Sequence, residues 1–109
     1  MSNKDKRTRE RYGLKLPVEV TWEDALGRAR RERTTTQDLS VLGCFIVCDD
    51  LIQRGCKVSV EIDLSIARAG VVGKRVSAQG RVVRNAASHN PKGGFGHGIR
   101  FDKFRFSKE

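Results

Sequence analysis

Apolar residues recur at every second position in several short runs of this chain, and this spacing constrains the fold more than any other feature. In residues 14–22, leucine, valine and tryptophan alternate with polar residues, and residues 57–64 repeat the pattern. Successive side chains of a β-strand point to opposite faces of a sheet, so the alternation predicts strands with one buried face. No run has the spacing of a convincing helix.

Turn-forming residues separate these runs at intervals that suit hairpins. Asp24–Gly27 predicts a turn, Gly55 marks another, residues 65–73 form a small-residue connection and residues 85–94 form a loop. Pro17 removes a ladder donor, so we expect its strand to lie at an edge or to be unpaired there. The spacing indicates an all-β fold, a six-stranded antiparallel barrel that is closed or partly closed. The expected strands are residues 14–22, 28–37, 44–48, 57–64, 75–84 and 95–101.

The charge balance indicates an anionic partner. The 109 residues suit one domain, and they contain 22 lysine and arginine residues against 13 aspartate and glutamate residues, a formal net charge of +9. Arginine outnumbers lysine, and its flat guanidinium matches phosphate groups and guanine edges. A charge that serves only solubility explains the same composition.

The three cysteines, Cys44, Cys48 and Cys56, lack the spacing of a zinc site. Cys44 and Cys48 fall in one expected strand, about 13 Å apart, which is too far for a disulfide. We therefore expect free thiols that serve as small buried residues, and a reducing, cytoplasmic environment. No apolar run is long enough for a membrane span, and no apolar segment near Met1 suggests a secretory leader.

Hairpin geometry brings the basic N-terminal segment close to a polar segment further along the chain. If the first turn centres between Ala25 and Leu26, antiparallel partners have numbers that sum to 51, so residue 11 faces residue 40 within one or two positions. Arg11 and Asp38 therefore become neighbours at one end of the barrel.

These two segments offer the groups that a guanine nucleotide requires. Arg7 and Arg11 can bind guanine O6 and N7 or pair with phosphates. The Asp38 carboxylate can accept hydrogen bonds from the other guanine edge, the Ser40 hydroxyl can donate or accept, and Gly43 permits a positive φ or a close backbone approach to a ligand. Each residue also has an ordinary alternative, because the arginines can form a solvated tail and the polar residues a turn bonded to its own backbone.

Two motifs resemble those of a known family. Residues 7–11 (RTRER) fit RxxxR, and residues 38–43 (DLSVLG) fit [DN]xSxxG. With their separation and the flanking "LKLPVEV", "VSVEIDL" and "GHGIRF", they resemble the PilZ domain, a bacterial receptor for cyclic di-GMP. The resemblance covers about residues 6–102 and implies a six-stranded antiparallel barrel.

The resemblance also implies roles for individual residues. The arginines of the first motif would grip guanine edges and phosphates, the aspartate and serine of the second would hold a guanine, and its glycine would shape the loop. Lys6 directly precedes RxxxR, where a cation is compatible with binding a stacked pair of ligand molecules. No metal, catalytic residue or cofactor besides the cyclic di-GMP ligand is expected. The implied ligand-binding residues are Lys6, Arg7, Arg11, Asp38, Ser40 and Gly43.

We expect a flexible arginine-rich arm in residues 1–12, the barrel in residues 13–102 and a short tail in residues 103–109. Many PilZ domains continue into a helix after the closing strand, but this tail is too short for one, and Phe104 and Phe106 favour a strand-like extension or a contact. Nucleotide binding is expected to order the arm and to create a surface for a downstream protein in motility, exopolysaccharide or related signalling.

Other functions fit the sequence less well. His89 and His97 are isolated, and no carboxylate pair or Cys/His arrangement suggests an enzyme. His97 is expected to be packed or hydrogen-bonded on the inner face of the last strand. The cluster Arg28–Arg33 leaves open a barrel that binds nucleic acid or a solvated strand face, and a PilZ-like adaptor without a nucleotide is a further alternative. Against nucleic acid, most aromatic residues fall on expected core faces, namely Trp22, Phe45, Phe95 and Phe101.

Overall fold

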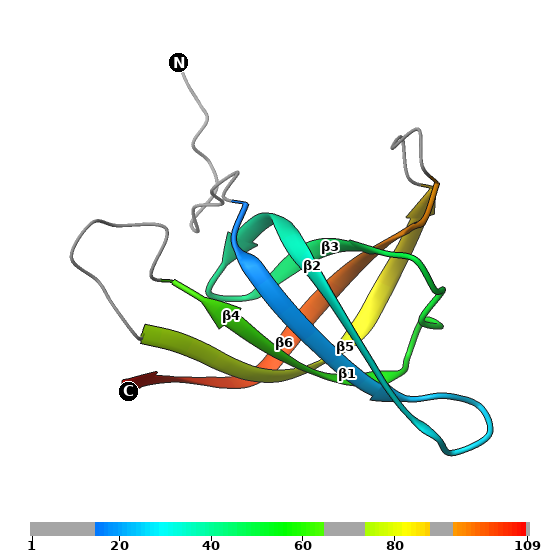
Figure 1. Ribbon diagram of the computed structural model, residues 1–109, viewed down its shortest axis with the longest axis horizontal. Coiled ribbons are helices and arrows are strands. Elements are labelled where there is room, and N and C mark those ends of the chain that lie inside the picture. Colours follow the sequence, from blue (N-terminus) through cyan, green and yellow to red (C-terminus); the bar gives the residue numbers. More distant parts are fainter. Residues whose placement is uncertain (1–14, 65–73, 88–92, 109) are drawn as a thin grey trace.

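The computed structural model describes residues 15–64, 74–87 and 93–108, in which six antiparallel strands close into a barrel (Figure 1). Around the barrel the strands follow the order β1-β2-β3-β6-β5-β4. The predicted all-β, six-stranded antiparallel barrel is therefore confirmed, and the described residues contain no helix. The strands are β1 (Pro17–Glu23), β2 (Ala29–Ser40), β3 (Gly43–Cys48), β4 (Lys57–Asp63), β5 (Lys74–Ala87) and β6 (Phe95–Lys108).

The alternating apolar side chains point into the barrel and form its core. Val20, Ile46 and Ile62 are fully buried, and burying one such side chain stabilises the fold by about 1.5–3 kcal/mol. Two aromatic residues that were expected on core faces lie outside the core. Phe95 is 42% exposed because it begins β6 at the rim of the barrel, and Phe45 points outward between its buried neighbours in β3.

The β1–β2 hairpin forms at the predicted turn. The Gly27 amide donates to the Asp24 carbonyl at 2.9 Å, and Gly27 has φ 79°, a conformation that favours glycine. Val18 lies opposite Thr34, so partner numbers sum to 52 and the predicted register was one position off, within its stated range. β1 lies between β2 and β4 and is not an edge strand; Pro17 is tolerated because pairing with β4 begins only at Val18.

β5 and β6 are longer than predicted. β5 continues through residues 85–87, so the loop predicted over residues 85–94 began too early. β6 continues to Lys108, which confirms a strand-like extension in the segment expected as a tail. The two strands pair along their whole length, so each supplies hydrogen-bond partners for the backbone of the other despite the polar sequence.

Strand direction defines two rims of the barrel. The β2–β3 rim holds the start of β1, the turn at Val41–Leu42 and the end of β6, and the opposite β1–β2 rim holds the turn at Asp24–Gly27 (Figure 1). The predicted arm (residues 1–12) and the predicted connection (residues 65–73) lie outside the described residues. Within the described part of the chain, no helix could cross a membrane.

Candidate functional site

A β-bulge in β2 determines which way the second motif faces. Thr36 is fully buried, yet Asp38 lies opposite Phe45 because Gln37 is an extra residue in the β2–β3 ladder. Strict alternation from Thr36 would turn Asp38 into the barrel. The bulge shifts the alternation by one residue, so Asp38 and Ser40 share the outer face.

The Ser40 hydroxyl stabilises the tight turn between β2 and β3. Its Oγ accepts a hydrogen bond from the Leu42 amide at 3.1 Å, and the Leu42 carbonyl accepts one from the Phe101 amide of β6 at 2.7 Å. Ser40 thus makes the local backbone contact typical of serine in turns. Because the hydroxyl acts as an acceptor there, its hydrogen can still be donated to a ligand.

Gly43 is required by the barrel itself. Gly43 lies opposite both Ser40 on β2 and Arg100 on β6. A Cβ atom at this position would collide with the backbone carbonyl oxygen of Ile99. The glycine has no positive φ, so it serves a close backbone approach, and the approaching backbone in this structure is β6.

Asp38 lies partly buried, with its Oδ1 atom covered from solvent. Burial, together with the negative charge of Asp38, raises the pKa of the neighbouring Cys44 thiol to about 12. Cys44 therefore stays protonated at neutral pH. The predicted contact of this carboxylate with a guanine edge stays a prediction.

Two hydrogen bonds fix the start of β1 beside the bulge. The Leu16 amide donates to Thr36 Oγ1 at 3.0 Å, and the Thr36 amide donates to the Leu16 carbonyl at 2.9 Å. Lys15 Nζ lies 3.4 Å from Gln37 Oε1. Lys15 is the first described residue, so the chain enters the barrel at the rim where β2 ends (Figure 1).

The structure therefore describes one half of the predicted site. Asp38, Ser40 and Gly43 lie together at the β2–β3 rim, on neighbouring strands. The basic residues of the other half, Lys6, Arg7 and Arg11, lie outside the described residues, and their contacts stay predictions.

A row of paired residues extends the outer face beyond Asp38. It runs from Asp38 through Phe45 on β3 and Gly98 on β6 to Arg84 on β5. The Phe45 ring covers Gly96, where a Cβ atom would lie 2.5 Å from its Cζ. The Arg84 guanidinium lies over Gly98 and places its Cζ 5.4 Å from the centroid of the Phe45 ring, a cation–π contact.

A second row runs beside the first. Ser40 lies opposite Gly43, Gly43 opposite Arg100, and Arg100 opposite Arg81 on β5. Sequence reasoning placed Phe45 on a core face and singled out neither Arg84 nor Arg100. The signal was present in "GHGIRF", because glycines at alternate positions leave one face of a strand without side chains and allow neighbouring side chains to cover it.

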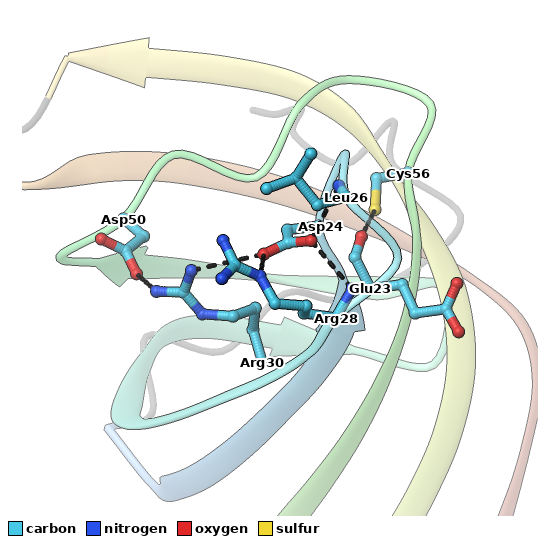
Figure 2. A network of polar contacts seen from close by, with 7 residues as sticks. All are labelled: Glu23, Asp24, Leu26, Arg28, Arg30, Asp50 and Cys56. Carbon is cyan, nitrogen blue, oxygen red and sulfur yellow. Dashed lines mark hydrogen bonds and ion pairs between the residues drawn. The ribbon is translucent and has the colours of Figure 1, made fainter.

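The cluster Arg28–Arg33 is engaged in ion pairs, mostly near the β1–β2 rim. Arg30 contacts Asp50 at 2.7 Å and Asp24 at 3.6 Å (Figure 2). A hydrogen bond from the Arg28 backbone to the Asp24 carboxylate lowers the pKa of Asp24. This pairing favours a solvated strand face. The remaining ion pairs of the cluster join Arg28 to Asp24 at 3.4 Å and both Arg31 and Arg33 to Glu19 at 3.5 Å.

His97 is packed and hydrogen-bonded, as expected. It is fully buried, and its Nε2 atom accepts a hydrogen bond from the Ile52 amide at 2.9 Å. Burial lowers the pKa of His97. Cys44 and Cys48 are free and buried, and Cys56 is free and partly exposed. Across the described ranges, no group of histidine, cysteine and carboxylate residues is placed to hold a metal ion.

Comparison with known proteins establishes the family. The family model of the PilZ domain matches residues 5–107, so this chain belongs to the PilZ domain family. The chain matches none of the curated proteins with which it was compared.

Two solved structures share the fold. The Bacillus subtilis inhibitor of motility MotI/DgrA is 18% identical, with a TM-score of 0.69, and the match covers 96% of this chain and 46% of that protein. The PilZ domain of YcgR from Escherichia coli, solved with c-di-GMP, is 14% identical with a TM-score of 0.59, covering 91% of this chain and 79% of that one. The chain thus spans less than half the length of MotI/DgrA.

Proposed function

We propose that this protein is a cyclic di-GMP receptor, and that nucleotide binding orders its N-terminal arm over the β2–β3 rim. The observation that carries the proposal is the bulge at Gln37, which turns Asp38 and Ser40 outward at the rim where β1 begins. Membership of the PilZ family and the ligand in the YcgR structure support the choice of nucleotide.

The chemistry of both motifs suits this ligand. The Asp38 carboxylate accepts hydrogen bonds from the N1 and N2 donors of a guanine, and the Ser40 hydroxyl donates its remaining hydrogen. Arg7 and Arg11 pair with phosphates or with guanine O6 and N7. Lys6 adds a charge beside them that is compatible with a stacked pair of nucleotides.

Binding acts as a switch. Ordering the arm costs about 1–2 kcal/mol for each fixed residue, so the arginine contacts must exceed that sum. The ordered arm and the covered nucleotide form a new surface, which a downstream protein recognises. We place this partner in motility, exopolysaccharide or related signalling in the cytoplasm, a choice supported by the motility role in the name of MotI/DgrA and by the free thiols. The protein acts by binding and not by catalysis.

Calorimetric titration tests this function. We expect cyclic di-GMP to bind with micromolar or tighter affinity, and GTP and a single-stranded oligonucleotide to bind much more weakly. Arg11→Ala should abolish most binding, and Asp38→Ala should weaken it and reduce the preference for guanine. Arg54→Ala, an exposed arginine near the opposite rim, is the charge-matched control. Unchanged affinity in Arg11→Ala, or a preference for the oligonucleotide with steep salt dependence, contradicts the proposal.

A further inference from the structure

We infer that Arg84 and Arg100 extend the nucleotide site across the outer face of the barrel, Arg84 as a stacking surface for a purine and Arg100 as a phosphate contact. This inference rests on the proposed function and adds residues outside both motifs. Its basis is the pair of rows that join Asp38 to Arg84 and Ser40 to Arg100.

The position of Arg84 favours stacking. Its guanidinium is held above Gly98 and against the Phe45 ring, with the Nε atom 3.4 Å from the position of a Cβ on Gly98. Arginine planes stack on nucleobases, and contacts with Gly98 and Phe45 restrict where this guanidinium can lie. Arg84 is exposed and lies three strands from Asp38 in the same row. A purine next to the guanine on Asp38 can therefore lie on this plane.

The position of Arg100 favours a charge contact. Its neighbour across the ladder is Gly43, which has no side chain, and Ser40 lies one strand further, about 10 Å away at ordinary strand spacing. An arginine side chain can cover much of this distance over a glycine. Arg100 is exposed, so its charge is available to a phosphate held above the turn.

The ion pairs of the barrel distinguish these two arginines from their neighbours. Arg81, which lies opposite Arg100, has Asp102 within 3.9 Å, and Arg30, Arg31 and Arg33 all have carboxylate partners. Among residues 15–64, 74–87 and 93–108, no carboxylate pairs with Arg84 or Arg100. A dianionic cyclic dinucleotide over Asp38 needs compensating charge on this face, and these side chains supply it.

Variants that separate shape from charge test the inference. Cyclic di-GMP is titrated into the wild-type protein, Arg84→Ala, Arg84→Lys, Arg100→Ala and Arg100→Lys, with Arg54→Ala as the control. We expect Arg84→Ala and Arg84→Lys both to weaken binding about tenfold, because lysine keeps the charge but lacks the flat surface. Arg100→Ala should weaken binding about tenfold and Arg100→Lys much less, because a phosphate contact needs charge more than shape.

The outcomes distinguish this inference from the proposed function. If the wild-type protein binds cyclic di-GMP but the Arg84 and Arg100 variants bind as Arg54→Ala does, the extended site is wrong and the receptor function stands. If the wild-type protein does not bind, both fail. Full affinity in Arg84→Lys overturns the stacking role of Arg84. Thermal unfolding of each variant verifies the fold, and these exposed substitutions should leave its midpoint close to that of the wild-type protein.

Discussion

Asp38 lies opposite Phe45 in the β2–β3 ladder, and this pairing exists because the strand carries one extra residue before the aspartate. The bulge places a carboxylate and an aromatic ring in one row on the outside of the barrel. It also keeps Thr36, two positions before the aspartate, on the inner face of the barrel. A single irregularity in the ladder therefore separates the part of β2 in which Thr36 faces the core from the part in which Asp38 and Ser40 face outward.

Thr36→Val should destabilise the start of β1. The substitution preserves shape but leaves the Leu16 amide without its buried acceptor, which costs about 1–3 kcal/mol. Urea unfolding measures the change, and Thr35→Val, on the exposed side of the same strand, is the control. Equal stability in the two variants argues against a structural role for this hydrogen bond. Leu16 directly precedes β1, so this hydrogen bond helps to fix the segment that leads from the N-terminal arm into the barrel. We therefore also expect weaker nucleotide binding in Thr36→Val.

Gly43→Ala should be among the most damaging small substitutions in the turn region. The added methyl group collides with the Ile99 carbonyl, and backbone cannot yield as a flexible side chain can, so we expect a loss of about 3 kcal/mol. Gly27→Ala is the comparison, because no atom lies within 4 Å of a Cβ at that position. Only the φ of 79° opposes the new side chain there, so the free energy of unfolding should fall by about 1 kcal/mol. Thermal or urea unfolding ranks the two variants, and a larger loss at Gly27 contradicts this account.

Stability should fall as pH decreases through the range in which His97 titrates. Burial depresses the pKa of His97 in the folded protein below its ordinary value of 6.5, so the unfolded chain binds the proton more readily. The free energy of unfolding is then at its full value above pH 6.5 and declines as pH falls toward the depressed pKa of the folded state. Urea unfolding between pH 7.5 and pH 5 tests this expectation. His97→Gln removes the titrating group, and an unchanged pH slope in that variant refutes it.

Neutralising arginines on the outer face of β2 should leave ligand binding intact. Arg31 and Arg33 share Glu19 and are largely exposed, and such pairs contribute about 0–1 kcal/mol. The double variant Arg31→Ala/Arg33→Ala should therefore unfold at nearly the wild-type temperature and bind cyclic di-GMP with nearly wild-type affinity. A large loss of affinity in calorimetry points to a ligand surface along β2 instead of the rim.

The strand pattern of this fold was predictable from local sequence, whereas the faces of the site were not. Alternating valines and leucines define β1 and β4 because one side of each strand must be buried. The bulge at Gln37 and the outward direction of Phe45 depend on how β2 fits β3 and β6, which no single segment encodes. Gly43 was predicted to allow a positive φ or a close backbone approach to a ligand, whereas the structure shows no positive φ and a close approach to the backbone of Ile99. The lengths of β5 and β6 likewise follow from mutual pairing of polar segments.

An even number of antiparallel strands returns the polypeptide to the side from which it started. In this barrel β1 begins and β6 finishes on the side that carries Asp38 and Ser40. Any module fused upstream or downstream would consequently be tethered on the side of the barrel where we propose that the nucleotide binds. Such a module would then contact the bound nucleotide directly, without a conformational change transmitted through the barrel.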